Sequence, residues 1–499
     1  MKKTIILALA LALIGGGAAY ANFCARDIVP AASLLVPYIV VDTVPGITGT
    51  PTPDQNGYTT LTVVTNVSSA KQLIHVTVYN AQSQGVVDFD EVLSGYDVWS
   101  INWRDLLTGA FYNFDTGDSE TPWKDNGSGP QAGQPQLGDF WAGTVGEIGD
   151  PWGPSTNVLN SSFDPLKPPQ DVDYTIPANT NCHMPWGDQS AYASTIVDGL
   201  QGAIGPWTDH DALCDQTGTT FNNLWLAGLS ATNNQIFFYA TIDTVKACGN
   251  LFPGADADYW DATIGNSSFP GYNTRNNVLT GYDIYLNFNQ KFSESLPTVN
   301  LEAYGLYTGT GFYSKLRKAA AATNAQDDRE PLGTAYAFNY FNSGGATTEV
   351  GVWKNYADFD TKNALVIACR PYLYYAWDEN ENSKARTSTY CPSGLCYGTV
   401  EPNVFPFETQ KVAVNSTNFS GLLPGNGWML IVFDPSIPIS AKTNSNNNAG
   451  TQAYVFAKYN YGTYSTAVEA TTMANYHCFG QTLPALNTYE GSTSTPVFQ

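Results

Sequence analysis

Hydrophobic and polar residues alternate with the two-residue period of β-strands over much of this chain. The alternation is clearest at 61–67 and 74–79, and because only Ser68–Lys71 separates these runs, we expect them to form a β-hairpin. A helical period is confined to 190–204 and 313–325. Further short runs rich in β-branched and aromatic residues lie at 236–245, 284–288, 335–340, 349–354, 364–368, 428–433 and 453–461. The pattern predicts a mainly β protein with two or more antiparallel β-sandwich units, a long loop-rich insertion and little helix.

Two short sequence segments occur twice, in the same order. Tyr38–Val44 is similar to Tyr239–Val245, and Leu93–Trp99 is similar to Leu279–Tyr285. Chance similarity in a chain rich in Tyr and Gly is the alternative to duplication. The expected organisation is an N-terminal β region at 22–305, with duplicated units at 30–105 and 235–305 and an insertion at 106–230, followed by a C-terminal β-sandwich domain at 306–499.

The first 21 residues have the pattern of a signal peptide. Two lysines precede the apolar run Ile5–Ile14, and small residues follow as far as Ala21. Gly15–Gly17 end the apolar run well short of the ~20 residues that a membrane-spanning helix needs. Cys24 invites a lipoprotein interpretation, but the preceding Phe23 is too large for that processing. We therefore expect export to the periplasm, the cell surface or the extracellular space.

All eight cysteines lie beyond the expected cleavage site. An even number of cysteines in an exported chain favours disulfides over a metal site, and no Cys-x-x-Cys pair is present. Cys391 and Cys396 are close enough in sequence to close a local loop. The remaining pairing is left open, because the sequence does not determine the connectivity.

Composition and charge narrow the class of partner. The chain of 499 residues carries 44 acidic and 22 basic residues, for a formal net charge of −22, and no cluster of Lys and Arg interrupts this balance. A chain of this charge repels phosphate backbones, so we expect no nucleic-acid partner. No stretch after the signal peptide is apolar enough for an integral membrane helix. With 43% hydrophobic residues the chain has enough apolar surface to fold.

Four segments have a recognisable pattern: Gly57–Ser69, Gly95–Asp105, Thr348–Lys354 and Tyr375–Asn380. Through them the chain resembles a group of uncharacterised secreted bacterial β-rich proteins. The resemblance spans 36–105 and 235–480, and it implies export and β-structure without assigning an activity or a catalytic residue.

The sequence offers little for nucleophilic catalysis. Only four histidines are present, and no Gly-x-Ser-x-Gly or His-Glu-x-x-His motif frames them. His75 falls on the polar side of its expected strand, so we expect a solvated histidine. His210 lies between Asp209 and Asp211, but we expect a loop histidine there because further convergent metal ligands are missing.

Paired carboxylates are the other catalytic possibility, since glycosidases use two acids across a sugar-binding cleft. In a chain with 44 acids, clusters of this size also arise on solvated loops. The candidate clusters are Asp88, Asp90 and Glu91; Asp256, Asp258 and Asp261; and Asp378, Glu379 and Glu381.

The Asp256, Asp258 and Asp261 cluster is also the candidate metal site. Carboxylate and backbone oxygens are the ligands that Ca²⁺ prefers, and a calcium ion would relieve repulsion within an acidic chain. The spacing does not fit an EF-hand loop. A structural Ca²⁺ is therefore the one cofactor that the sequence suggests.

Aromatic residues suggest a ligand-binding role, because sugar rings stack on Trp and Tyr side chains. The chain has 12 Trp, 30 Tyr and 24 Phe. Trp99 and Trp103 share strand parity with Ile101, which predicts core packing for both. The candidate ligand-binding residues lie in the Pro- and Gly-rich insertion and are Trp123, Trp141, Trp152 and Trp186.

Taken together, the sequence predicts an exported, non-catalytic surface, matrix or ligand-binding protein, with a glycan or a cell-surface molecule as its partner. A secreted glycan-active hydrolase that uses paired carboxylates is the first alternative. An outer-membrane β-barrel is the second, because runs such as Ala453–Tyr461 alternate, although the eight cysteines and the terminal Gln499 are unusual for that class.

Overall fold

A computed structural model describes fourteen stretches of the chain and the residues Val197, Leu200, Pro253 and Tyr259. Nearly all of the described segments are antiparallel strands, which confirms the mainly β fold class with little helix. The described stretches are 29–44, 52–81, 85–108, 110–111, 187–188, 235–245, 273–303, 312–315, 329–330, 332–354, 372–388, 404–405, 408–433 and 452–472. In the described part of the chain, no helix is long and apolar enough to cross a membrane.

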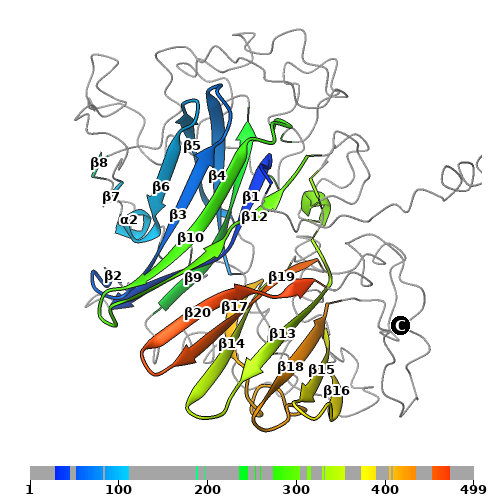
Figure 1. Ribbon diagram of the computed structural model, residues 1–499. Helices are drawn as coiled ribbons and strands as arrows, with labels where there is room; N and C mark the ends of the chain where they lie inside the picture. The colour runs from blue at the N-terminus through cyan, green and yellow to red at the C-terminus, as the bar shows by residue number, and fades with distance from the viewer. Residues whose placement is uncertain are drawn as a thin grey trace, which may run out of the picture.

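The first half of the chain forms one β-sandwich, coloured blue to green in Figure 1. Its larger sheet has the strand order β12 (Val299–Leu301), β1 (Ser33–Val44), β9 (Gln235–Val245), β4 (Gln72–Asn80) and β5 (Gly85–Leu93). Its smaller sheet has the order β11 (Phe292–Pro297), β10 (Leu279–Asn287), β3 (Tyr58–Asn66) and β6 (Val98–Asn102). The short strand β2 (Thr52–Pro53) pairs antiparallel with the C-terminal end of β1. Two further short strands, β7 (Ala110–Phe111) and β8 (Gly187–Asp188), pair with each other.

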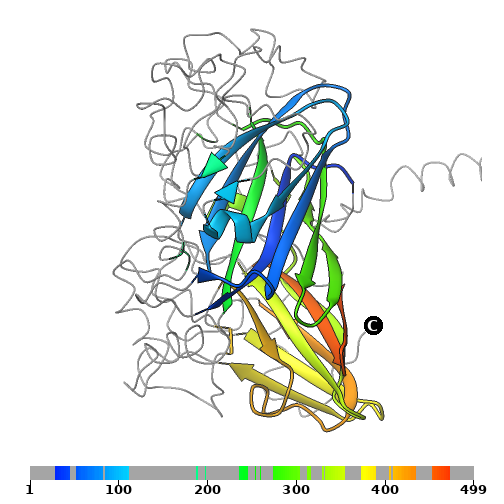
Figure 2. The same cartoon turned by 90° about the vertical axis from the view of Figure 1, so that its left-hand side faces the viewer.

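The second half forms another β-sandwich, coloured yellow to red, and Figures 1 and 2 show the two sandwiches end to end. Its larger sheet has the order β16 (Ser383–Ser388), β15 (Tyr372–Asp378), β18 (Asn426–Val432), β13 (Ala335–Phe341) and β21 (Thr471–Thr472). Its smaller sheet has the order β17 (Thr409–Ala413), β14 (Ala346–Lys354), β19 (Ala453–Tyr461) and β20 (Tyr464–Glu469). The 3-10 helix η4 (Phe312–Lys315) lies between the two sandwiches in the sequence.

The two sandwiches have the same topology. Both sheets of the first sandwich become the sheets of the second when their strands are exchanged one for one in chain order. In this exchange β13 to β21 replace β1, β3, β4, β5, β6, β9, β10, β11 and β12. The structural repeat therefore relates 33–301 to 335–472. The two ranges that share sequence similarity, 30–105 and 235–305, instead contribute strands to the same two sheets and build one sandwich between them. Within that sandwich, β1 and β9 are antiparallel neighbours.

The predicted hairpin of 61–67 and 74–79 is wrong. The first run is β3 in the smaller sheet and the second is β4 in the larger sheet, so the connection at 67–71 crosses from one sheet to the other. Val64 on β3 and Ile74 on β4 both point into the core between the sheets. Alternation identified both strands, but it carries no information about which sheet each strand joins.

Each sandwich has its own hydrophobic core. The expected core roles of Trp99 and Trp103 are confirmed, since both are buried in the first core. Trp103 does not continue the strand but begins helix α2 (Trp103–Thr108), where the Asn102 side-chain oxygen accepts a hydrogen bond from the Arg104 backbone N–H at 3.2 Å. That bond satisfies one of the open donors at the start of the helix.

A third apolar cluster joins the two sandwiches. Tyr239 of β9 meets Trp353 of β14 edge to face, with ring centroids 5.8 Å apart, and Tyr38 of β1 lies 5.9 Å from Phe456 of β19. The backbone N–H of Glu408 also donates to the Ala81 carbonyl across this boundary at 2.8 Å. The two sandwiches therefore share a buried interface, which combines apolar packing with direct hydrogen bonds.

Candidate functional site

An open groove of about 430 Å³ lies on the second sandwich. The turn between β13 and β14 forms one wall, and the hairpin of β19 and β20 forms the other. Tyr461 and Tyr464 are 62% and 79% exposed, and Phe341 is also exposed. The other residues that line the groove are Ser343, Ala346, Asn426, Tyr459, Asn460, Ser465 and Thr466.

Tight turns hold the aromatic side chains in place. Tyr461 and Tyr464 are directly opposite each other across a two-residue loop, and Gly462 in that loop has a φ of 59°, which suits glycine. On the other wall, Gly344 and Gly345 have φ values of 63° and 88°. A short hairpin loop fixes the register of its strands, so both tyrosines project from a defined position on a rigid scaffold.

Side-chain hydrogen bonds brace the same wall. The Asn426 side-chain oxygen accepts from the Ser343 hydroxyl at 2.8 Å and from the Asn342 backbone N–H at 3.1 Å. Phe341 packs edge to face on Tyr459 at 5.2 Å, and the Tyr459 hydroxyl donates to the Asn339 carbonyl at 3.1 Å. These bonds hold the residues of this wall in place.

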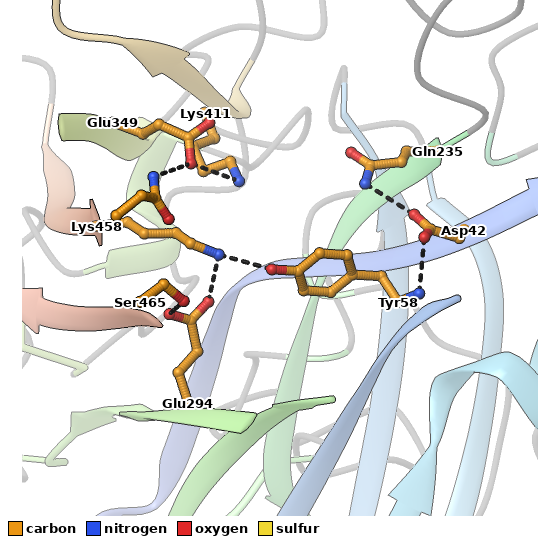
Figure 3. Close-up of polar contacts among 9 residues, drawn as sticks. Asp42, Tyr58, Gln235, Glu294, Glu349, Lys411, Lys458 and Ser465 are labelled. Carbon is orange, nitrogen blue, oxygen red and sulfur yellow. Dashed lines mark hydrogen bonds and ion pairs between the residues drawn. The ribbon is translucent and has the colours of Figure 1, made fainter. Parts of the chain in front are cut away.

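Figure 3 shows a charged cluster between the two sandwiches, which contacts the groove lining through Ser465. The ammonium group of Lys458 is 2.7 Å from both a Glu294 carboxylate oxygen and the Tyr58 hydroxyl. The other Glu294 oxygen accepts from the Ser465 hydroxyl at 3.1 Å. A second pair joins Lys411 and Glu349 at 3.2 Å. Ser465 therefore connects the groove lining to the buried ion pair.

The environment of this cluster shifts the pKa values of its members. Burial lowers the pKa of Lys458, and the neighbouring positive charge of Lys411 acts in the same direction. Burial pushes the pKa of Glu349 upward, but the attraction of Lys411 and Lys458 outweighs it, so that pKa lies below its usual range. The opposite charges stabilise each other, and the Lys458 and Glu294 pair is the more deeply buried of the two.

A closed polar cluster lies on the outer face of the larger sheet of the first sandwich. His75 is fully buried, and its Nδ1 atom is 2.8 Å from an Asp90 oxygen, while its Nε2 atom is 3.6 Å from Asp88. Burial lowers the pKa of His75, but the negative charges of Asp90 and Asp88 raise it by more than burial lowers it. The net shift of the pKa is therefore upward. The predicted solvated histidine is therefore wrong. Alternation placed His75 on the correct side of its strand, but that side is covered.

Residues distant in sequence provide the cover. The hydroxyl groups of Tyr259 and Tyr313 both donate to one Asp243 carboxylate oxygen, at 2.7 and 2.8 Å. The Ser33 hydroxyl donates to the other Asp243 oxygen, and the Arg329 guanidinium donates to Ser33 at 2.6 Å. These groups are buried and bonded to one another, so the cluster acts as an internal brace of the sheet.

The structure places the predicted carboxylate clusters in different environments. Asp88, Asp90 and Glu91 lie on β5 of the first sandwich and are buried. Asp378 is partly exposed and caps the turn between β15 and β16 by accepting from the Asn380 and Asn382 backbone N–H groups at 2.8 and 2.9 Å.

The remaining predicted site residues lie outside the described residues. They are the ligand-binding candidates Trp123, Trp141, Trp152 and Trp186, the metal candidates Asp256, Asp258 and Asp261, the cysteines including Cys391 and Cys396, and His183, His210 and His477. Within the part of the chain that the structure covers, no three His, Cys, Asp or Glu side chains are placed to hold a metal ion together.

The groove aromatics were not among the sequence candidates. The available signal was the segment Tyr459–Tyr464, in which three tyrosines flank a glycine suited to a tight turn. Interpreted as a strand alone, that segment gives no reason to expect exposed rings. Its hairpin end shows which tyrosines extend beyond the sheet.

Comparison with known proteins assigns this chain to no family. No family model, no curated protein sequence and no solved structure matches this chain. Functional argument therefore depends on the geometry of the molecule itself.

Proposed function

We propose that this protein is an exported, non-catalytic carbohydrate-binding protein, and that the groove of the second sandwich is its binding site. The observation that carries the proposal is the pair of exposed rings, Tyr461 and Tyr464, at the mouth of a groove that amide and hydroxyl groups line. The apolar faces of sugar rings stack on such side chains, and amides and hydroxyls bond to the sugar hydroxyl groups.

The composition of the groove favours binding over hydrolysis. A glycosidase of the common kind needs two carboxyl groups on either side of the scissile bond. The described residues that line this groove include no Asp or Glu. Glu294 and Glu349 lie behind the lining, where they accept hydrogen bonds from Ser465 and Asn460 and pair with lysines.

The net charge suggests which carbohydrates to test first. A formal charge of −22 repels anionic polysaccharides, and the lining residues that the structure describes include no Lys or Arg to offset it. The expected ligands are therefore neutral oligosaccharides.

Binding to a panel of neutral oligosaccharides of glucose, xylose, mannose and N-acetylglucosamine tests the proposal. We expect the wild-type protein to retain at least one of them. Tyr464→Ala and Tyr461→Ala should each weaken its binding about 3-fold to 10-fold in titration calorimetry, because each loses one stacking contact. Tyr96→Ala is the matched control, since Tyr96 is an exposed tyrosine of the first sandwich.

Two results would contradict the proposal. The wild-type protein could retain no oligosaccharide of the panel, or the Tyr461→Ala, Tyr464→Ala double variant could bind as tightly as the wild type. Unchanged melting temperatures would establish that any loss of binding in the variants is local.

A further inference from the structure

A second groove lies beside the groove that we propose to bind carbohydrate. Its volume is about 400 Å³. We call it the neighbouring groove, and the proposed carbohydrate site the first groove. Asn342 and the start of β14 at 346–348 form one side of the neighbouring groove. The other side consists of 413–416 and 422–425, at the two ends of the connection from β17 to β18.

The two grooves are adjacent on the surface of the second sandwich. Ala346 lines both of them. Consecutive residues are also divided between them, since Asn342 and Gly425 line the neighbouring groove and Ser343 and Asn426 line the first. Figure 1 shows the β13–β14 turn and the β17–β18 connection at the same end of the sandwich as the β19–β20 hairpin. The β13–β14 turn therefore lies between two parts of one surface.

The order of the strands shows how far the two grooves extend together. The strands β17, β14, β19 and β20 are neighbours in that order, so three inter-strand spacings separate β17 from β20. The end of β17 lines the neighbouring groove, and Tyr464 of β20 lines the first. At about 4.8 Å per spacing, the two grooves together cover roughly 14 Å. A span of this width suits a chain of sugar units better than a single unit.

The neighbouring groove offers hydroxyl groups to a ligand. Thr347 and Ser416 are both exposed in its lining. Within the described part of the chain, neither of these two side-chain hydroxyls has a hydrogen-bond partner. Leu423 and Pro424 add apolar surface to the same lining. Hydroxyl groups near apolar carbon atoms suit a sugar, which presents C–H groups and hydroxyl groups together.

Hydrogen bonds hold the two sides of the neighbouring groove together. The Val414 backbone N–H donates to the Thr348 carbonyl at 2.8 Å, and the Asn342 side-chain amide donates to the Val414 carbonyl at 2.6 Å. The Asn415 side-chain oxygen accepts from the Thr417 backbone N–H at 3.0 Å, which fixes the turn after β17. The lining is therefore held in place by the protein itself, so that a ligand does not have to order it on binding.

The neighbouring groove differs from the first groove in its aromatic content. Tyr461 and Tyr464 line the first groove, whereas the described residues of the neighbouring groove include no aromatic side chain. Stacking on aromatic rings therefore contributes to binding in the first groove, and hydrogen bonds dominate in the neighbouring one. The described lining of the neighbouring groove also includes no charged side chain, so it matches the neutral ligand expected for the first groove.

We propose that the two grooves form one extended site for a linear, neutral oligosaccharide. Tyr461 and Tyr464 stack on sugar units at one end of the oligosaccharide, and Thr347 and Ser416 bond to hydroxyl groups of units further along it. This inference rests on the proposed carbohydrate binding and specifies its ligand, because an oligosaccharide that reaches both grooves is bound more tightly than a short one.

Titration calorimetry with oligosaccharides of two to six units tests the proposal, using the sugar of the panel that the wild-type protein retains. We expect the dissociation constant to fall about 10-fold or more from the two-unit to the six-unit oligosaccharide, because only the longer one reaches the neighbouring groove. Thr347→Val and Ser416→Ala each remove one hydrogen bond, so each should weaken binding of the six-unit oligosaccharide about 3-fold to 10-fold. Both should leave binding of the two-unit oligosaccharide unchanged, whereas Tyr464→Ala should weaken binding of both.

Thr417→Val is the matched control, and it should bind every oligosaccharide like the wild type. Thr417 is exposed in the same connection but is not among the described residues that line either groove. Far-UV circular dichroism identifies any variant that fails to fold.

The possible failures are distinguishable. Binding of equal strength at every length would overturn the extended site, as would Thr347→Val and Ser416→Ala variants that bind the six-unit oligosaccharide as tightly as the wild type. Carbohydrate binding in the first groove would survive either result. A wild type that binds no oligosaccharide of any length would instead refute the proposed function, and the extended site with it.

Discussion

Thr62, Trp103 and Asp283 form a hydrogen-bonded chain inside the first sandwich. The Trp103 indole N–H donates to the Thr62 hydroxyl at 2.7 Å, and that hydroxyl donates to an Asp283 carboxyl oxygen at 2.5 Å. Burial raises the pKa of Asp283 to about 8, although the bond from Thr62 acts in the opposite direction. A carboxyl group in this position favours its neutral form, so its ionisation opposes folding.

Replacing Asp283 with Asn should therefore stabilise the protein in neutral and alkaline solution. Between about pH 4 and the folded pKa of about 8, the Asp283 carboxyl holds a proton in the folded state that it has released in the unfolded chain. The free energy of unfolding of the wild type therefore falls as pH rises through that window. Asp283→Asn should increase the free energy of unfolding by about 1 to 3 kcal/mol above that window and flatten the pH dependence. Urea unfolding on both sides of the window measures both effects.

Thr62→Val provides the companion measurement, since it removes the hydroxyl and retains the carboxyl group. Its pH dependence should persist or steepen, because the bond from Thr62 lowers the Asp283 pKa. An Asp283→Asn protein whose stability falls with pH as steeply as that of the wild type would contradict the assignment.

At the scale of single residues, alternation predicts which side of a strand a side chain occupies but not what covers that side. His75 shows the difference. Its side of β4 follows from its neighbours in sequence, whereas its burial depends on Tyr259, whose ring lies 6.0 Å from the imidazole. No local pattern connects these two residues.

At the scale of elements, the β-strands could be predicted from the sequence better than their partners. The run at 453–461 is a strand as expected, and so is the run at 349–354, which β14 extends to Ala346. The sheet that each strand joins depends on contacts across hundreds of residues, such as the pairing of β1 with β9. Short connections suggested a hairpin for β3 and β4, but in a sandwich a short connection can equally cross between sheets.

The ion pair of Lys458 and Glu294 joins β19 of the second sandwich to β11 of the first. Lys458→Met leaves the Glu294 carboxylate buried without its cation, so the free energy of unfolding should fall by about 3 to 5 kcal/mol. Adding Glu294→Gln should restore part of that loss, because it removes the uncompensated charge. Chemical denaturation of the single and double variants measures the difference.

Lys411→Met is the matched control on the same sheet. The Lys411 and Glu349 side chains retain 19% and 29% exposure, so breaking their pair should cost less than about 1 kcal/mol. Equal losses for Lys458→Met and Lys411→Met would refute the claim that the Lys458 pair is the buried one.

At the scale of the whole molecule, the repeat of two sandwiches could not be found from the sequence. Equivalent positions hold unrelated residues because they face different surroundings. When β10 is aligned with β19 and β3 with β14, Ile284 occupies the position of Lys458. Lys458 bonds across the interface, whereas Ile284 is partly exposed. The connections also differ in length. The link from β6 to β9 spans 103–234, but the equivalent link from β17 to β18 spans only 414–425, so no constant sequence period survives.

The candidate site was equally hidden from sequence reasoning. Its walls come from two turns more than a hundred residues apart, near Gly345 and Gly462, and only the fold brings them together. Composition did indicate that aromatic side chains would bind a ligand, but the predicted candidates were tryptophans of the insertion. The most exposed aromatic residues of the groove are instead tyrosines of the hairpin of β19 and β20.

Hydrogen–deuterium exchange with and without the best-bound oligosaccharide tests the central claim most directly. The account predicts slower exchange of backbone amides at Phe341–Ala346 and Tyr459–Thr466, with unchanged exchange on the first smaller sheet at Tyr58–Asn66. Slower exchange confined to other parts of the chain, with both walls of the groove unchanged, would contradict it.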